Sequence, residues 1–586
     1  MKTNKVGKLV LSLLFCTLAT IGSIFAQTAT WNGGTNGLLN TNTWLDGNVP
    51  SSGYGWVFTN SLASSLTNNF SSGFNVGGMS FSSSAAALVI NGGTVNLTGG
   101  ITNNSLFNQT ISTALIVNTN VTFTNGLGSG ANSYISIVGN ISGSGTITYG
   151  VTNGGSRLQL SGSNSSFTGA VYFNSGRVQI SKSNSVSSLA DYYLNNSGSG
   201  GAGVYLAGTS GSVYTFGSLN GTNTNVLVSA NGGNTTNTIE VGARDNDSFF
   251  AGNISSNNLG TTGVLNLVKK GIGTFSLINS NTMNGTFTVN NGVGQLGNGG
   301  GTGKLQNATI VVNDTGTFAI KRSNTVTQGV DFSSNAISGT GSFGQYGTGT
   351  TILNAVNTFS GNTYINSGTL KLASTGSINN SAEINIKSTY DVSSVSNYIL
   401  QTGHTISGTG TLVGSVNNSG TISPGSNNIG TLTMTGNQSW LVGGSYNWDV
   451  YDYKGIAGNG FDQVKINGSL SMTNLTSNSF TINVGSLLTQ SGGIGAGTNY
   501  TFEPFSTNSW VILKTTGGIN GFDNSSFNLN FNNFRDDLYT ASSFYLSTDG
   551  NNLSLNLVAV PEPSVIFMAG FLLVFVIGLK FRDYIV

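Results

Sequence analysis

The sequence predicts an all-β chain whose middle is an elongated, right-handed parallel β-helix, a solenoid of stacked coils. Its composition is the first reason, because Gly supplies 86 of 586 residues, charged residues only 7%, and Asn, Ser and Thr most of the polar positions. These polar side chains disfavour helices and favour turns, and Thr favours strands. The second reason is a hydrophobic fraction of 37% with a net charge of +1, which permits a buried core and argues against disorder. A repeated unit in the middle of the chain is the third reason.

The low charge and the single cysteine exclude several classes of protein. A net charge of +1 without a Lys or Arg cluster argues against nucleic-acid binding, which needs a concentrated basic surface. Cys16 lies inside the predicted export signal, so the mature chain is expected to have no disulfide and no cysteine-based metal site. Repeated backbone hydrogen bonds and stacked side chains must then stabilise a large exported chain.

The first 26 residues have the layout of a secretory signal peptide. Three lysines fall within the first eight residues, an apolar run covers residues 9–19, and Ala26 precedes Gln27 at the expected cleavage site. We therefore predict a signal helix over residues 1–26, export through the Sec machinery, and cleavage between Ala26 and Gln27. An uncleaved anchor helix is the alternative.

Residues 27–84 are expected to form an N-terminal cap. The segment is rich in large aromatics, including Trp31, Trp44 and Trp56. A cap is physically required, because the open end of a solenoid exposes unpaired strand edges.

Residues 85–440 are predicted to form the solenoid, with clear repeat units near 154–180, 267–297 and 349–372. Each unit contains about three short strands separated by Gly or Asn turns, which is typical of one coil of a β-helix. One coil cannot bury its apolar face alone, whereas stacked coils bury a continuous core.

The clearest repeat, residues 349–372, predicts which side chains face the core. Side chains alternate between the two faces of a strand. The predicted core positions are Leu353, Ile365, Leu370 and Leu372, and the predicted outward positions are Thr363 and Thr369.

The repeats resemble the autotransporter-associated β-strand repeat of bacterial surface proteins. The matching segments are Gly349-Thr350-Thr351-Ile352-Leu353, Asn357-Thr358-Phe359-Ser360-Gly361 and Thr363 to Leu372. Met283 stands where an aromatic residue is usual, and Trp31-Asn32-Gly33 and Trp56-Val57-Phe58 resemble the cap that precedes such repeats. The resemblance implies a pectin-lyase-like β-helix that is passenger-like in character.

Residues 441–559 are predicted to be a C-terminal β region that closes the solenoid. Aromatic and charged residues become more frequent after about residue 501. Residues 518–536 are expected to form a less regular β cap, and residues 544–558 the final strands.

The end of the chain, residues 560–586, predicts a single hydrophobic helix. Residues 565–579 carry no charge, and Lys580 and Arg582 follow. This run is short for a standard membrane span of about 20 residues, but the flanking aromatics lengthen it and the basic residues favour a cytoplasmic end. Pro561 and Pro563 prevent the helix from continuing upstream. We predict a transmembrane segment over residues 565–579.

This tail resembles the PEP-CTERM sorting signal of Gram-negative bacteria. Its parts occur in the required order: Pro561-Glu562-Pro563, the apolar run, and the basic residues Lys580 and Arg582. The resemblance implies that an exosortase, a membrane transpeptidase-like enzyme, recognises these residues and removes the tail. The chain would then be released or attached at the cell surface. A plain membrane anchor is the alternative.

Local patterns that suggest chemistry each have a simpler structural explanation. His404, the only histidine, has no nucleophile motif beside it and is expected in a turn or on the coil surface. Two acidic pairs, Asp245 with Asp247 and Asp449 with Asp452, could bind Ca²⁺ weakly, but neither has the spacing of a calcium loop. Both are expected in solvated turns. We therefore predict no catalytic, cofactor-binding or metal-ligating residue, and no cofactor.

The many outward Asn, Ser and Thr residues allow two interpretations. They could bind sugars weakly along the extended flank that a solenoid presents. Alternatively, Asn side chains stack inside the turns as a hydrogen-bonded ladder, which stabilises the coils and recognises no ligand, and this interpretation is favoured.

These observations predict a non-enzymatic, secreted structural or adhesive protein of the cell surface or extracellular matrix. It would be membrane-associated through its C-terminal helix before processing. The expected partners are the Sec machinery and an exosortase-type sorting enzyme, with extracellular polysaccharide as a further candidate. The alternatives are a polysaccharide-degrading β-helix enzyme, indicated by clustered carboxylates or basic residues on one face, and a carbohydrate-binding module, indicated by a row of exposed aromatics.

Overall fold

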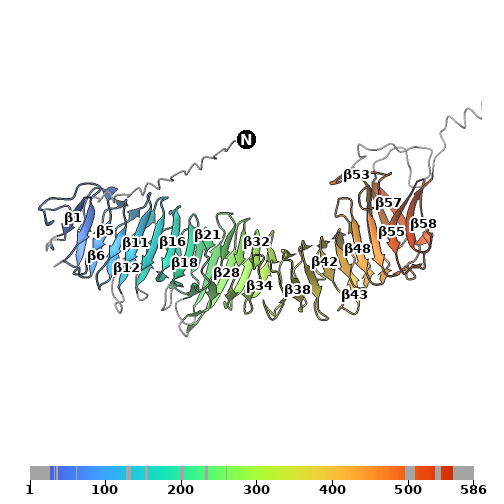
Figure 1. The fold of residues 1–586 in the computed structure, drawn as a ribbon, viewed down its shortest axis with the longest axis horizontal. Coiled ribbons are helices and arrows are strands. Elements are labelled where there is room, and N and C mark those ends of the chain that lie inside the picture. The colour runs from blue at the N-terminus through green and yellow to red at the C-terminus, as the bar shows by residue number, and fades with distance from the viewer. Residues whose placement is uncertain are drawn as a thin grey trace, which may run out of the picture. The chain divides into compact units, whose positions relative to one another are not determined.

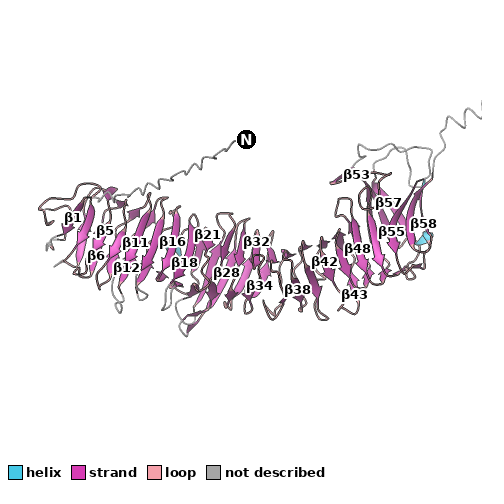
Figure 2. Cartoon of the chain, in the orientation of Figure 1, coloured by secondary structure: helices cyan, strands magenta, loops and turns pink. Residues whose placement is uncertain are grey.

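The computed structural model describes residues 27–31, 33, 37–41, 43–60, 63–126, 133–151, 156–197, 203–230, 235–258, 261–494, 508–534 and 543–558. The chain divides into two compact units, the first ending at Gln179 and the second beginning at Ile180, except that residues 198–202 group with the first. Strands make up nearly all of the regular structure in each unit (Figures 1 and 2). The predicted signal helix over residues 1–26 and the predicted helix over residues 565–579 lie outside the described residues.

The first unit contains three sheets of parallel strands. One sheet consists of β1 (Thr28–Trp31), β2 (Gly55–Phe58), β5 (Met79–Phe81), β8 (Ile101–Asn103), β11 (Val121–Asn125), β14 (Ile147–Val151) and β16 (Ala170–Ser175). The second consists of β3 (Ser65–Asn68), β6 (Leu88–Gly92), β9 (Gln109–Ile111), β12 (Tyr134–Ile137), β15 (Arg157–Leu160) and β17 (Arg177–Ile180). The third consists of β4 (Phe74–Val76), β7 (Val95–Leu97), β10 (Leu115–Ile116) and β13 (Ile141–Ser142). Paired strands are one coil apart in the chain, as where Val121 pairs with Ile147, which is the connectivity of a solenoid.

The second unit has the same plan. Its longest sheet consists of β24 (Ser248–Phe250), β29 (Thr274–Leu277), β32 (Val293–Leu296), β35 (Thr317–Ile320), β37 (Ser342–Gln345), β39 (Thr363–Ile365), β41 (Glu383–Ile386), β44 (Thr405–Gly408), β47 (Thr421–Pro424), β50 (Ser445–Val450) and β53 (Phe480–Thr489), with β54 (Gly492–Ile494) and β57 (Phe527–Asn533) both paired to β53. A second sheet consists of β36 (Val326–Thr327), β38 (Thr350–Leu353), β40 (Thr369–Leu372), β42 (Thr389–Asp391), β45 (Thr411–Val413), β48 (Thr431–Thr435), β51 (Gln463–Asn467), β55 (Asn508–Thr515), β59 (Asn552–Leu557) and β58 (Phe544–Thr548). A third consists of β43 (Tyr398–Leu400), β46 (Val416–Asn418), β49 (Gln438–Trp440), β52 (Leu470–Ser471) and β56 (Ile519–Asn520).

Shorter sheets occupy the earlier part of the second unit. One consists of β20 (Val213–Phe216), β23 (Thr236–Val241), β28 (Val264–Lys269), β31 (Thr286–Val289) and β34 (Thr309–Val312). In addition, β19 (Gly203–Leu206), β22 (Leu227–Ala230) and β25 (Asn253–Ser255) pair in succession within this unit. The remaining pairs are β18 (Asp191–Ser197) with β21 (Ser218–Asn220), β30 (Ser280–Asn281) with β33 (Lys304–Leu305), and β26 (Asn257–Asn258) with β27 (Thr261–Thr262). Two short 3₁₀ turns, η1 (Ser183–Ser185) and η2 (Asn524–Ser526), are the helical elements of the described chain. None of the described residues form a helix long and apolar enough to cross a membrane. The predicted all-β, parallel solenoid is confirmed.

The clearest repeat shows how the period of two builds the core. Leu353, Ile365, Leu370 and Leu372 are each at most 1% exposed, so their predicted inward orientation is confirmed. Thr369 faces outward as predicted, and it belongs to a row in which Thr350, Thr369, Thr389 and Thr411 pair in succession.

The predicted outward orientation of Thr363 is wrong. The residue is fully buried, and its Oγ1 lies 2.9 Å from the Oγ of Ser381. Thr363 and Ile365 are two residues apart on β39, so alternation places both on the same face and turns Tyr364 outward. The hydrogen bond to Ser381 is what allows a hydroxyl at this core position.

The two solenoid ends are closed by different means. In the first unit, the buried rings of Trp31 and Trp44 meet edge to face at 5.4 Å, and Trp44 Nε1 donates to the carbonyl of Leu39. In the second unit, the parallel order ends when β59 pairs antiparallel with both β55 and β58. The antiparallel partner β59 covers the edge of β55, which would otherwise remain unpaired.

Candidate functional site: a polar groove in the second unit

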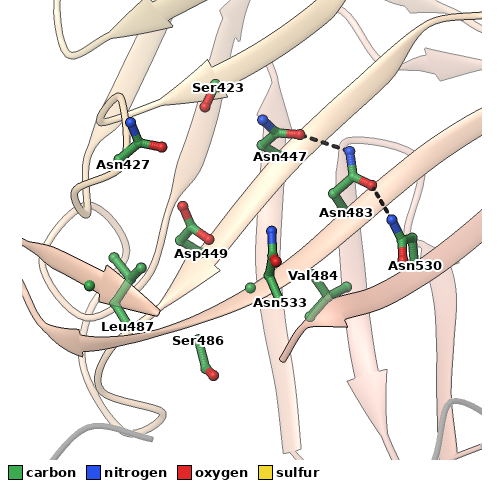
Figure 3. Close-up of a pocket in the computed structure, with 12 residues that line it drawn as sticks. Ser423, Asn427, Asn447, Asp449, Asn483, Val484, Ser486, Leu487, Asn530 and Asn533 are labelled. Atoms are coloured by element: carbon green, nitrogen blue, oxygen red, sulfur yellow. Dashed lines mark hydrogen bonds between the residues drawn. The ribbon is translucent and has the colours of Figure 1, made fainter. Parts of the chain in front are cut away.

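A groove of about 540 Å³ opens on the outer face of the longest sheet of the second unit. Its lining is polar and consists of Ser423, Asn427, Asn447, Asp449, Asn483, Val484, Gly485, Ser486, Leu487, Gly493, Asn530 and Asn533. Figure 3 shows the labelled members of this set around the opening. This volume lies within the usual range for sites that bind small ligands.

The floor of the groove is formed by β50, β53 and β57. Alternation turns Tyr446 and Trp448 of β50 into the core, where both are buried, and turns Asn447 and Asp449 outward. Residues 447 and 449 pair in register with Asn483 and Gly485 of β53. Equivalent positions of successive coils therefore line up across the floor.

An amide row crosses this floor. The Nδ2 of Asn483 donates to the Oδ1 of Asn447 at 2.8 Å, and the Nδ2 of Asn530 donates to the Oδ1 of Asn483 at 2.8 Å (Figure 3). The asparagine ladder was predicted inside the turns, whereas these amides are joined between neighbouring strands, as are Asn96 of β7 and Asn75 of β4. Since each amide carries two N–H groups and two lone pairs, the row keeps hydrogen-bonding capacity on its open side.

A notch beside the amide row holds Asp449. Gly485 lies between Asp449 of β50 and Asn533 of β57 in the sheet register. A Cβ atom at residue 485 would overlap the Oδ1 of Asp449, so the absence of a side chain makes room for the carboxyl group. A β-bulge between residues 483 and 485 shifts the register of β57 and brings Asn533 opposite Gly485.

Two chain segments form the wall of the groove. One is the loop after β47, where Gly425, Ser426 and Asn427 all have positive φ, at 75°, 56° and 67°. The other is the β53–β54 hairpin, whose Gln490 carbonyl accepts a hydrogen bond from the Ile429 amide at 3.1 Å. The Ser426 hydroxyl also donates to Glu383, two coils away, at 3.0 Å. The loop after β47 is thus fixed to the sheet through Glu383 and to the hairpin through Gln490.

Asp462 ties this wall to the floor. Its buried carboxylate accepts hydrogen bonds from the amide of Gly430 at 2.8 Å and from the amide of Asp449 at 3.1 Å. Burial raises the pKa of Asp462 well above its usual 3.8, and the nearby Asp449 raises it further. Burial also raises the pKa of Asp449 to about 6. The groove therefore contains a carboxyl group that titrates near neutral pH.

The residues singled out from the sequence are dispersed. Nδ1 of the half-buried His404 lies 2.8 Å from the carbonyl oxygen of Ser381, so His404 supports a turn, as expected. Asp245 and Asp247 lie in an exposed turn and accept hydrogen bonds from the amides of Ile272 and Thr274 in the next coil. Their role is to join coils.

The second acidic pair does not form one site. Asp452 lies in a turn, where it accepts from the Lys454 amide at 3.0 Å. Asp449 was expected in a solvated turn as well, and that expectation is wrong. It lies on β50, because the alternation along Ser445–Val450 continues through it. It is also largely desolvated, because the wall covers its outward side chain.

Sequence reasoning missed Asp462 and the grouping of the four floor asparagines. The signal that would have found the floor is the alternation of Asn447 and Asp449 with buried aromatics, repeated by Asn483 and Gly485 one coil later. Asp462 has no such signal, because only the folded loop between β50 and β51 brings it under the wall.

The predicted processing sites remain predictions. Pro561, Glu562, Pro563, Lys580, Arg582 and Ala26 lie outside the described residues. Gln27 is the first described residue, is exposed, and accepts a backbone hydrogen bond from Gly55 at 2.9 Å.

Within the part of the chain that the structure describes, no group of three or more His, Cys, Asp or Glu side chains is placed to hold a metal ion. No family model and no curated protein matches the chain.

Proposed function

We propose that the chain is an exported structural or adhesive protein of the cell surface or extracellular matrix, sorted through an exosortase-type enzyme that recognises the PEP-CTERM-like tail. The observation that carries this proposal is the parallel solenoid itself, in which outward polar rows pair along successive coils. Such a framework offers a long, repetitive surface with little charge, which suits attachment and load-bearing.

The charged residues of the framework support a structural role. Lys270 pairs with Glu240 at 2.8 Å and Lys371 with Asp391 at 2.8 Å, each between neighbouring coils. Arg322, which is only 3% exposed, pairs with Asp331 and donates to the carbonyl of Gly303. These charged groups form ion pairs and hydrogen bonds within the stack of coils, so their contacts serve stability.

We infer the finer features of the fold on the same basis. The winding is right-handed and pectin-lyase-like, residues 1–26 form a cleaved signal helix, and residues 565–579 form a membrane helix until the tail is removed. The support is the resemblance of residues 349–372 to the autotransporter-associated repeat and the order of motifs in residues 560–586.

The sorting proposal is tested by replacing Pro561-Glu562-Pro563 with three alanines. The variant keeps the apolar run, so it should remain in the inner membrane with its tail uncleaved, whereas the wild type should reach the surface without the tail. Cell fractionation and immunoblotting measure both outcomes. A variant that reaches the surface in processed form would contradict a sorting role for these residues.

A second candidate function, saccharide binding, is favoured by one observation, the polar groove over β50, β53 and β57. Enzymatic depolymerisation of a polysaccharide is distinct from saccharide binding and can be assayed directly with the purified protein. Hydrolysis by the purified protein, abolished by replacing one carboxylate, would overturn the non-enzymatic proposal.

A further inference from the structure

The groove offers donors and acceptors together, and this restricts its ligand. The asparagines of the floor provide N–H donors and carbonyl acceptors, Ser423 provides a hydroxyl, and Asp449 provides a carboxyl group. Among the described residues that line the groove, none is Lys, Arg or His. An anionic ligand would therefore meet a carboxyl group without a compensating cation from the lining.

A metal ion fits the lining no better than an anion does. Hard cations such as Ca²⁺ take six to eight oxygen ligands, usually with several carboxylates. Asp449 is the only carboxylate among the described lining residues. The carbonyl oxygens of Asn447 and Asn483 already accept hydrogen bonds from neighbouring amides of the row. A ligand with many hydroxyl groups, each both donor and acceptor, matches the mixed lining better.

The spacing of the amide row suits an extended ligand. Neighbouring strands lie about 4.8 Å apart, so Asn447, Asn483 and Asn530 repeat at that interval across the floor. This interval is comparable to the length of one sugar ring. Thr421 and Ile422 of β47 pair with Ser445 and Tyr446 of β50, so the next position along both strands places Ser423 beside Asn447 and continues the row by one coil.

The wall of the groove is held in an unusual conformation. Ser426 and Asn427 are consecutive non-glycine residues with left-handed φ, a strained conformation that persists where surrounding contacts enforce it. The enforcing contacts are those of Ser426 with Glu383, Ile429 with Gln490 and Gly430 with Asp462. The wall is thus preformed, which lowers the entropic cost of binding.

We propose that this groove binds a neutral oligosaccharide segment that lies along the amide row, with Asp449 accepting hydrogen bonds from its hydroxyl groups. The inference rests on the proposed surface function, for which it names the ligand class and the place of attachment. The described lining residues include no aromatic side chain for stacking, so affinity comes from hydrogen bonds and from several contacts along one polysaccharide chain.

The test uses the exported protein, purified as the cell processes it, on an array of neutral and acidic oligosaccharides. Any neutral glycan that binds is then titrated by calorimetry, and Ca²⁺ is titrated separately. Asn483→Ala should lower the association constant about ten-fold, because it removes the central amide and both hydrogen bonds of the row. Asn530→Ala, at the row's end, is the second variant should Asn483→Ala fail to fold.

Asn417→Ala is the matched control. Its Nδ2 donates to Asn397 at 2.6 Å in an amide pair of the same unit that lies outside the groove. It should leave the association constant within about two-fold of the wild type. Circular dichroism of each variant confirms that the coils are intact.

Two results would overturn the inference. One is that the wild-type protein binds no neutral glycan at millimolar concentration. If the protein is nevertheless sorted to the surface, that result disproves the role of the groove and leaves the proposed surface function intact. The other is tight Ca²⁺ binding abolished by Asp449→Asn, which would make the groove a cation site.

Discussion

Two regions of the second unit use the same alternation for different ends. Around β38, β40 and β42, a row of threonines in register lies on the outer face, and the inner face is packed with fully buried residues such as Leu353 and Leu370. Around β50, β53 and β57, the outer face carries a row of amides and a carboxyl group, and the segments after β47 and β53 form the wall beside them. The first region is a plain coil whose residues serve stability. The second shows that a groove forms where the connections after β47 and β53 rise beside such a coil.

The comparison predicts the largest loss of stability in the plain coils. Leu370→Ala should lower the free energy of unfolding of its coils by about 2–5 kcal/mol, because it opens a cavity beside a fully buried position. Thr369→Ala, on the outward face of the same strand, should cost less than about 0.5 kcal/mol. Limited proteolysis with mapped cleavage sites measures both. Equal protection of the two variants would contradict the assigned strand faces.

The groove region should respond to pH in the opposite sense to a salt-bridged carboxylate. The folded-state pKa of Asp449 is raised from 3.8 to about 6, so the folded state binds more protons than the unfolded state between these values. The contribution of Asp449 to stability is therefore greatest below pH 4 and is lost as the pH rises through 6. Asp462, whose pKa is raised by burial and by Asp449, acts in the same direction. Burial, with Asp462 and Asp449 nearby, also raises the pKa of the Tyr446 hydroxyl.

Asp449→Asn should remove the Asp449 part of this pH dependence. It should also raise the free energy of unfolding at pH 7 by up to about 3 kcal/mol, the equivalent of a pKa shift of about two units. Asp452→Asn is the control, because the amide can keep the turn bond to Lys454 and should change stability by less than about 0.5 kcal/mol. Urea unfolding at pH 5 and pH 7, followed by tryptophan fluorescence, reports on Trp448 and Trp510 beside the groove. Identical pH profiles for Asp449→Asn and the wild type would show that Asp449 is not desolvated.

The same two regions show how far sequence reasoning reaches. The all-β solenoid and the inward leucines of the best repeat were predictable, because they depend on the local period of two and on turn residues. Thr363 was assigned to the wrong face although the period itself fixes it, because a polar residue was assumed to point outward. Its burial depends on Ser381, which belongs to the next coil.

The groove was less predictable, because it depends on register between coils of unequal length. Asn447, Asn483 and Asn530 are 36 and 47 residues apart in the chain and meet only once the coils are stacked. The bulge that places Asn533 opposite Gly485 and the loop that buries Asp462 have no periodic signal in the sequence.

The smallest effect should come from the ion pairs between coils. Lys371→Met removes a 2.8 Å contact with Asp391 whose lysine side chain is 31% exposed. Solvent screening limits its worth, so the free energy of unfolding should fall by less than about 1 kcal/mol, and less in high salt. Thermal unfolding of Lys371→Met and the wild type at low and high salt measures the difference. A loss as large as that of Leu370→Ala would mean that charge, and not the apolar core, holds the coils together.

The central claim, that this solenoid is an exported and sorted surface protein, is tested most directly by intact-mass and terminal-peptide mass spectrometry of the protein isolated from cells. The account predicts a chain that begins at Gln27, ends near Pro561 without the apolar tail, and carries either a free new C-terminus or an attached envelope component. A surface chain that retains residues 565–579, or a chain that retains residues 1–26 inside the cell, would contradict it.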